Sequence, residues 1–146
     1  EPILLYKGII YEYVEDECVV SWPMTNGLKN ANCIHSVLEL LNVINKNKEQ
    51  YVNSYGYVPE INAALHCGPI IQAEVGSLKS DIAFYGDVMN VTSRILNKCP
   101  ELGSQVLISE ELFEQLPPSN LFKLKSKGEF KLKGKTDSID LFSLAL

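Results

Sequence analysis

The sequence predicts an α+β fold in which helices pack on a largely antiparallel sheet. Three observations carry this prediction. Short runs of β-branched and aromatic residues come in adjacent pairs, longer segments between them place apolar residues every three or four positions, and Gly and Pro stand at the junctions. With 146 residues, of which 46% are apolar, the chain can bury one core, so we expect a single domain.

A hairpin and a long helix are predicted first. Residues 9–14 and 18–22 have the composition of strands, and Glu15-Asp16-Glu17 forms an acidic tip between them. Residues 30–55 are predicted to form a helix with one buried face, on which helical spacing places Cys33, Ile34, Val37, Leu38, Leu41 and Ile44. A glycine and a proline just after residue 55 end this helix.

The middle of the chain is predicted to hold three short strands and a second helix. The strands cover residues 60–65, 70–75 and 81–85. The helix, over residues 88–98, opens at Gly86-Asp87 and closes at Pro100 and Gly103. Its buried side is expected to carry Val91, Ile95 and Cys99.

The last part of the chain adds a strand, a short helix and a closing hairpin. Residues 105–108 have strand composition, and Ser109 is expected to cap a short helix to Leu116, because two acidic residues follow it in the first turn. Strands over residues 122–132 and 138–144, joined by a turn that contains glycine, complete the sheet.

The charge, the cysteines and the apolar runs argue against several classes of protein. A net charge of −5 and a pI near 5.0 argue against a nucleic-acid binder, which needs a basic face. The four cysteines form no CxxC pair and indicate neither a zinc site nor a disulfide framework. The spacing of the cysteines favours reduced thiols, so we expect a cytoplasmic domain. No apolar run approaches the ~20 residues of a membrane span, so we expect this segment to be soluble and to make no membrane contact, while membrane attachment of the parent protein is left open.

Asn90 and Arg94 are the first candidate pair for chemistry. They are four positions apart on the predicted second helix, so they share one face and can reach a common ligand. An arginine there can stabilise charge that develops on a phosphate, and an asparagine offers a neutral donor and acceptor to a ribose. On spacing alone, the alternative is a surface helix with a solvated arginine.

Three further groups are candidates for binding or structure. Asp16, at the acidic tip, could present a carboxylate to Mg²⁺, and the alternative is a solvated turn. His66 and Cys67 are predicted to be adjacent strand residues that point to opposite faces, so we assign both a structural role. Alternation along the closing hairpin would put its lysines on one face, usually solvated, although one could touch a phosphate: Lys123, Lys125, Lys127, Lys131, Lys133 and Lys135.

Several of these segments resemble the motifs of one family. Tyr85-Gly86-Asp87-Val88-Met89-Asn90, followed by Ser93-Arg94, resembles the GDxVNxxxR signature of class III adenylate and guanylate cyclases. The segment from Tyr11 to Glu17 resembles the GDE hairpin that carries a metal-binding Asp in that family. Further motifs agree in order and spacing, namely Leu65-His66-Cys67-Gly68, the turn Gly76-Ser77, Val106-Leu107-Ile108-Ser109-Glu110 and Phe130-Lys131-Leu132-Lys133-Gly134-Lys135. The resemblance implies a ferredoxin-like class III nucleotidyl cyclase fold over residues 1–146.

The resemblance also implies an activity and roles for single residues. Class III cyclases convert ATP or GTP to 3′,5′-cyclic AMP or cyclic GMP and pyrophosphate, and they work as head-to-tail dimers with active sites at the interface, so we expect a homodimer. In that scheme Asp16 of one subunit is a metal ligand. Asn90 of the other subunit orients the ribose, and Arg94 stabilises the phosphate transition state. Lys133 matches a family lysine near the phosphates.

Glu12 and Ala83 match the two family positions that select the purine base. Guanylate cyclases carry Glu with a small residue there, and adenylate cyclases usually carry Lys with Asp or Thr. The carboxylate of Glu12 would accept hydrogen bonds from N1–H and the 2-amino group of guanine, but it would face the lone pair of adenine N1. The pairing therefore favours GTP, whereas bacterial relatives that depart from both patterns and still make cyclic AMP leave the base open.

Two features depart from the family pattern. The family's first strand, with its other metal-binding Asp, would lie upstream of Glu1, so the domain is expected to lack its N-terminal strand and most of its first helix. The two-metal site for Mg²⁺ or Mn²⁺ would then be half complete, and we expect these 146 residues alone to be inactive. Glu15 stands where the hairpin motif has Gly, and if this position needs a positive φ, the glutamate costs stability and displaces Asp16.

Three alternatives to an active cyclase are open from the sequence. One is a catalytically silent cyclase-like module that binds nucleotide or only dimerises, which the residues at Glu15 and Glu12 would permit. A GGDEF-type diguanylate cyclase shares the fold class, but no GG[DE]EF tip occurs at Glu15-Asp16-Glu17. The third is an unrelated α+β binding domain.

Overall fold

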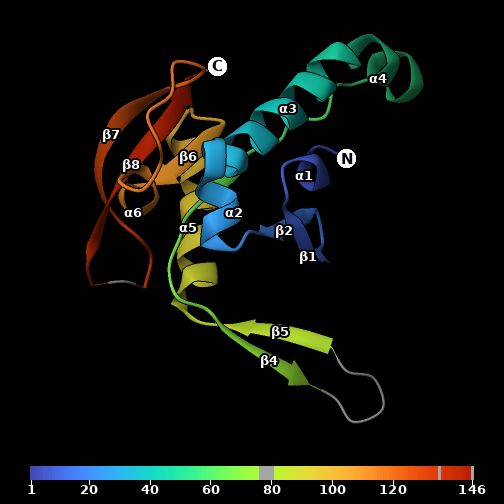
Figure 1. Ribbon diagram of the computed structural model, residues 1–146. Helices are drawn as coiled ribbons and strands as arrows, with labels where there is room; N and C mark the ends of the chain where they lie inside the picture. The colour runs from blue at the N-terminus through green and yellow to red at the C-terminus, as the bar shows by residue number, and fades with distance from the viewer. Residues whose placement is uncertain (76–80, 135, 146) are drawn as a thin grey trace. The chain divides into compact units, whose positions relative to one another are not determined.

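The computed structural model describes residues 1–75, 81–134 and 136–145. These residues form two compact units. The first is Glu1–Ile61 with Gln115–Leu121, and the second is Asn62–Glu114 with Phe122–Ala145. Figure 1 shows the helices and strands of both. The predicted turn at Gly76-Ser77 and the predicted contribution of Lys135 lie outside the described residues.

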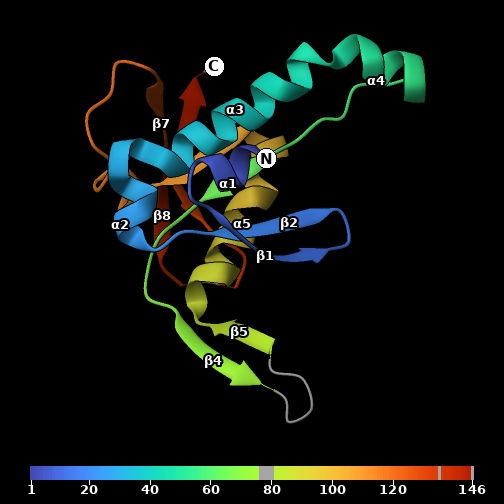
Figure 2. The same ribbon diagram turned by 45° about the vertical axis from the view of Figure 1, so that its right-hand side comes forward.

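The first unit combines a β-hairpin with helices. Its elements are α1 (Pro2–Leu5), β1 (Ile9–Val14), β2 (Glu17–Ser21), α2 (Met24–Leu28), a 3₁₀ turn (Lys29–Ala31), α3 (Asn32–Lys46) and α4 (Lys48–Tyr55). The predicted hairpin is confirmed, with β1 and β2 antiparallel (Figure 2). The short helices α1 and α2 are not predicted by the sequence, because four or five residues are too few to show a helical period, and both contact α3. The indole nitrogen of Trp22 donates to the carbonyl of Tyr6 at 2.9 Å and holds the end of α1 beside β2.

The helix predicted over residues 30–55 is divided in the structure. α3 ends at Lys46, α4 begins at Lys48, and Asn47 between them has φ −100° and ψ 11°. The side-chain amide and the backbone amide of Asn47 both donate to the carbonyl of Val43, at 2.7 and 3.2 Å, so the side chain shares a helical acceptor with the backbone where the helix is interrupted. None of the described helices has both the length and the apolar character that spanning a bilayer requires.

The second unit is built on a four-stranded sheet. Its elements are β3 (Ala63–Leu65), β4 (Ile71–Val75), β5 (Asp81–Tyr85), α5 (Asp87–Leu102), β6 (Val106–Ser109), α6 (Glu110–Phe113), β7 (Lys123–Lys131) and β8 (Ser138–Ala145). The strand order in the sheet is β3-β6-β8-β7, in which β3 and β6 are parallel and the other pairs are antiparallel. β4 and β5 form a separate antiparallel hairpin. The predicted mixture of helices and mostly antiparallel strands is confirmed.

Two helices cover opposite faces of this sheet. The buried core on the α5 side comprises Val91, Ile95, Cys99, Leu107, Leu132, Ile139 and Leu141, each at most 9% exposed. Burial raises the pKa of the Cys99 thiol to about 11, as expected for a thiolate that would lose its water. On the other face, Phe113 of α6 stacks on Phe142 of β8 with ring centroids 4.0 Å apart. Leu141 and Phe142 are consecutive strand residues, so they point to opposite faces.

The prediction that Pro100 closes the second helix is wrong, because α5 continues through Pro100 to Leu102. The helix ends where Gly103 takes a left-handed conformation with φ 58°. Behind Gly103, the amide of Ser104 donates to the carbonyl of Cys99 at 3.0 Å. Burial of Cys99 in the core holds this last turn, and that tertiary contact outweighs the hydrogen bond that the proline cannot make.

The prediction that the lysines of the closing hairpin share one face is also wrong. Ser126 pairs with Phe142 but Gly128 pairs with Leu141, so Lys127 is an extra residue in a β-bulge. Paired residues share a face, and the bulge therefore puts Lys125 on the α5 side of the sheet and Lys131 on the other side.

Candidate active site

The start of α5 is held by two glycines. Gly86, before the first turn of α5, has φ 144°, and a β-carbon there would lie 3.1 Å from the carbonyl oxygen of Pro69. A β-carbon on Gly68 would lie 2.6 Å from Cγ2 of Val88. The Gly68-Pro69 segment thus packs directly against the start of α5, and the predicted opening of the helix at Gly86-Asp87 is confirmed.

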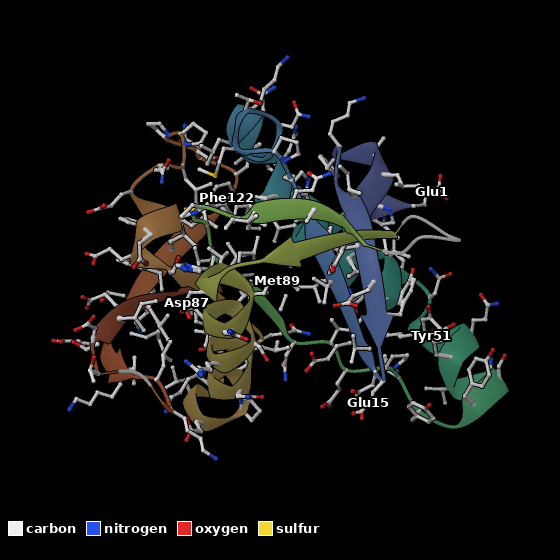
Figure 3. The ribbon with its side chains drawn as sticks, turned by 90° about the horizontal axis from the view of Figure 1, so that it is seen from below. Glu1, Glu15, Tyr51, Asp87, Met89 and Phe122 are labelled. Carbon is white, nitrogen blue, oxygen red and sulfur yellow. The ribbon has the colours of Figure 1, made fainter. Side chains whose placement is uncertain are left out.

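Asn90 and Arg94 lie one turn apart on α5, as the sequence predicts. Their neighbours Val91 and Ile95 are buried in the core, whereas Asn90 is exposed and Arg94 is partly buried. Figure 3 shows the first turn of this helix, with Asp87 and Met89 labelled. Arg94 is the only arginine among the 13 basic residues of the sequence.

The turn between β7 and β8 lies against Arg94. A β-carbon built on Gly134 would be 3.3 Å from Nη2 and 3.7 Å from Cζ of Arg94, so the guanidinium lies against the backbone of this glycine. Lys133, the preceding residue, is exposed. Within the described ranges, no carboxylate pairs with Arg94. The structure therefore brings Arg94 beside Gly134, whose neighbour in sequence is the exposed Lys133.

The remaining candidates lie on other elements. Asp16 and Glu12 belong to the β1–β2 hairpin of the first unit, and both are exposed. Glu12 is opposite Val19 and next to an irregularity in the strand register. The backbone of Ala83 lies in β5, opposite Ala73, in the second unit. The candidate residues are thus divided between the two units, with Glu12 and Asp16 in the first and the others in the second.

Glu15 has the positive φ that the family motif implies for this position. Its φ is 53°, and the two-residue turn that it forms with Asp16 joins β1 to β2 (Figure 3). The hairpin pairing continues up to Val14 and Glu17 on either side of the turn, so the glutamate is accommodated without loss of the strand register there.

His66 and Cys67 are consecutive residues whose structural role stays a prediction. Both follow β3 and lie outside a strand, so the prediction that they are adjacent strand residues is wrong. Nδ1 of His66 lies 2.7 Å from Oγ of Ser109, and the same Oγ accepts a hydrogen bond from the amide of Leu112 and caps α6 as predicted. Burial, and then the negative charge of Glu111, raise the pKa of the Cys67 thiol, which disfavours the nucleophilic thiolate.

Asp16 fits a divalent cation as one ligand among several. Its carboxylate is exposed on a tight turn and offers the oxygen donor that Mg²⁺ and Mn²⁺ prefer. Among the described residues, no cluster of three or more His, Cys, Asp or Glu side chains is arranged to hold a metal. Ligands other than these side chains, such as phosphate oxygens and water, would have to complete the coordination.

The contact between Arg94 and Gly134 joins two of the recognised motifs, and comparison with known proteins gives their family. Residues 18–145 match the family model of the adenylate and guanylate cyclase catalytic domain. The chain belongs to this family. The predicted resemblance and the predicted class III cyclase fold are confirmed.

Two sequence relatives of the chain are named adenylate cyclases. Adenylate cyclase 2 of Rhizobium meliloti (strain 1021) is 37% identical over 144 residues, which cover 99% of this chain and 40% of that protein. Adenylate cyclase of Anabaena cylindrica is 27% identical, over 94% of this chain and 28% of that protein. The chain thus spans less than half the length of these relatives.

The solved structures show the fold. The adenylyl cyclase CyaB from P. aeruginosa has a TM-score of 0.75 at 16% identity, over 99% of this chain and 75% of that one. The guanylyl cyclase Cya2 has a TM-score of 0.75 at 17% identity, over 99% and 73%. Sequence motifs had indicated this family, but they did not indicate that Gly134 touches Arg94.

Proposed function

We propose that this cyclase domain converts ATP or GTP to the 3′,5′-cyclic nucleotide and pyrophosphate in intracellular signalling. The observation that supports this most directly is the position of Arg94. Its guanidinium lies against Gly134, beside exposed Lys133 and one helical turn from exposed Asn90. A cationic surface next to a neutral donor and acceptor suits a triphosphate attached to a ribose.

The reaction is an in-line displacement at the α-phosphorus. The 3′-oxygen forms the new P–O bond and loses its proton to water, and the bond from the α-phosphorus to the bridging oxygen breaks, so pyrophosphate leaves with the electron pair. Arg94 stabilises the charge on the phosphate oxygens as the displacement proceeds. Asn90 holds the ribose so that the 3′-hydroxyl is aligned, and Lys133 contacts the triphosphate.

Asp16 would hold Mg²⁺ or Mn²⁺. Such an ion, when bound, lowers the pKa of the 3′-hydroxyl and holds the triphosphate. The carboxylate of Asp16 stands at the exposed turn of the β1–β2 hairpin, where a nucleotide-bound ion can reach it.

The acting residues come from two copies of the chain. Asp16 and Glu12 lie in the first unit, whereas Asn90, Arg94 and Lys133 lie in the second. We assign the first set to one subunit and the second set to its partner in a homodimer, as in the head-to-tail scheme of the family. ATP and GTP are cytoplasmic metabolites, so the reaction belongs to the cytoplasm.

The base that is selected depends on Glu12 and Ala83. Exposed Glu12 offers a carboxylate that complements guanine, whereas a relative at 37% identity is named an adenylate cyclase. Replacing Glu12 by Lys removes the acceptor for guanine N1–H. We expect Glu12→Lys to lower the kcat/KM ratio of GTP to ATP by ~10-fold or more.

The test of the function is cyclic nucleotide formation by the full-length protein with ATP or GTP and Mg²⁺ or Mn²⁺. We expect Asp16→Ala and Arg94→Ala each to lower kcat by ~10²-fold or more. Lys98→Ala is the matched control, because Lys98 is a cation one turn further along α5 that pairs with Glu101 at 2.8 Å, and it should retain activity. Product formation by Arg94→Ala at the original rate would refute the assignment. Nucleotide binding without product would instead indicate the catalytically silent module.

A further inference from the structure

Gly134 differs from the other left-handed glycines of the hairpins and helix ends. Its φ is 77°, and those of Gly56, Gly103 and Gly128 are 83°, 58° and 93°. A β-carbon on any of these three would have no atom within 4 Å, whereas one on Gly134 would meet the guanidinium of Arg94 at 3.3 Å. Gly134 is therefore needed twice, for its backbone conformation and for the space above its α-carbon.

The turn that contains Gly134 is anchored to the helix that carries Arg94. Leu132, two residues earlier, is 4% exposed and belongs to the same core cluster as Val91 and Ile95 of α5. These two α5 residues flank Arg94 in sequence. The buried leucine therefore holds the turn at a set distance from the helix, and the missing side chain at Gly134 provides the surface on which the guanidinium rests.

We propose that Gly134 is a positioning residue for Arg94. This proposal rests on the function proposed above. It acts through Arg94, because the absence of a side chain at position 134 sets where the guanidinium lies against the turn that follows Lys133. A residue with a β-carbon at position 134 displaces the guanidinium by a few tenths of an ångström or more. Catalysis by a positioned charge is sensitive to shifts of this size.

The first measurement compares Gly134→Ala with Gly128→Ala in the full-length protein. Both glycines lie in the β7–β8 hairpin with positive φ, so both substitutions impose similar backbone strain, but only the first meets Arg94. We expect similar falls in Tm, with kcat lowered about 10-fold by Gly134→Ala, KM within about twofold, and kcat unchanged by Gly128→Ala. Equal falls in kcat for the two variants would overturn the inference.

Gly134→Asn separates the effect of backbone strain at position 134 from the effect of displacing the Arg94 guanidinium. Asparagine tolerates the left-handed region better than alanine does, so its Tm should lie closer to that of the unaltered protein while kcat stays low. In an Arg94→Lys background, where the guanidinium is absent, Gly134→Ala should cause no further fall in kcat. A further 10-fold fall in that background would show that Gly134 acts independently of Arg94 and would contradict the proposal.

The second measurement does not depend on activity. Phenylglyoxal labels arginine guanidinium groups, and mass spectrometry of the peptide that contains Arg94 gives its labelling rate. We expect Gly134→Ala to raise this rate and Gly128→Ala to leave it unchanged. An unchanged labelling rate of Arg94 in Gly134→Ala would overturn the inference that Gly134 holds the guanidinium in place. If labelling changes as expected but the unaltered protein makes no cyclic nucleotide, the proposed function fails while the contact stands.

Discussion

At the tip of the β1–β2 hairpin, Glu15 adopts a backbone conformation that favours glycine. Its φ is 53°, whereas Asp16, the second residue of the turn, has a negative φ. A positive φ at the first turn position alone is the pattern of a type II′ turn, in which that position is usually glycine. Position 15 therefore has the positive φ on which the predicted cost of a glutamate depended. The glutamate carries a conformational cost at the turn that presents Asp16.

We expect Glu15→Gly to raise the free energy of unfolding by about 1 kcal/mol, because it removes the steric strain of a left-handed residue with a β-carbon. Glu17→Gly is the matched control. It removes the same charge from an exposed position at the start of strand β2 and should lower the free energy of unfolding by about 0.5 to 1 kcal/mol, since glycine loses more backbone freedom on folding. Urea unfolding of both variants measures this, and effects of the same sign would contradict the interpretation of the turn.

At the scale of the element, β7 depends on its bulge. Leu124 and Ser126 lie opposite Leu144 and Phe142, whereas Gly128 and Phe130 lie opposite Leu141 and Ile139. The extra residue between Ser126 and Gly128 thus exchanges the two faces of the strand part-way along it. The second half of β7 can then turn its apolar residues towards α5, and Phe130 packs there against the core.

Deletion of Lys127 tests this description of β7. Lys127 is the extra residue, so we expect its removal to produce a regular ladder with all other pairs kept, and to change the free energy of unfolding by about 1 kcal/mol or less. Deletion of exposed Glu129 is the control. The strand could then keep Phe130 in place only by turning Lys127 to the core face, which should cost several kcal/mol, about 3 or more. Thermal unfolding distinguishes the two deletions, and equal losses would contradict the bulge.

At the scale of the whole molecule, the function proposed above takes its site residues from two chains. Asp16 lies in the first unit of the chain and Arg94 in the second. In a head-to-tail homodimer each site takes Asp16 from one subunit and Arg94 from its partner. If one subunit carries a substitution at Asp16 and its partner a substitution at Arg94, both substitutions fall in the same site and the other site stays intact.

Mixing two inactive variants tests this arrangement. In the full-length protein, Asp16→Ala and Arg94→Ala should each lose nearly all activity alone. After subunit exchange in a 1:1 mixture about a quarter of the normal activity should return, because half of the dimers are mixed and each of these has one intact site of two. Cyclic nucleotide formation before and after exchange measures the recovery. A mixture of Arg94→Ala with Asn90→Ala is the control, since both residues belong to the same half-site, and recovery there would contradict the division.

The sequence alone determined the local elements and part of the site. The hairpin with Asp16 at its tip, the helix with Asn90 and Arg94 on one face, and the capping of α6 by Ser109 all depend on neighbours within a few residues. Such features can be predicted because backbone preference and side-chain period act over a short range. The family motifs added the fold, which the structural comparisons confirm.

The tertiary structure alone decided where distant segments meet. The continuation of α5 through Pro100 depends on burial of Cys99, and the placement of Lys125 and Lys131 on different faces depends on the pairing of β7 with β8. The contact of Arg94 with Gly134 depends on the core, because Leu132 before the closing turn and the α5 residues on either side of Arg94 are buried in one cluster. Packing between segments 40 residues apart in the sequence is not encoded in the period of either segment, so it can be found only in the folded chain.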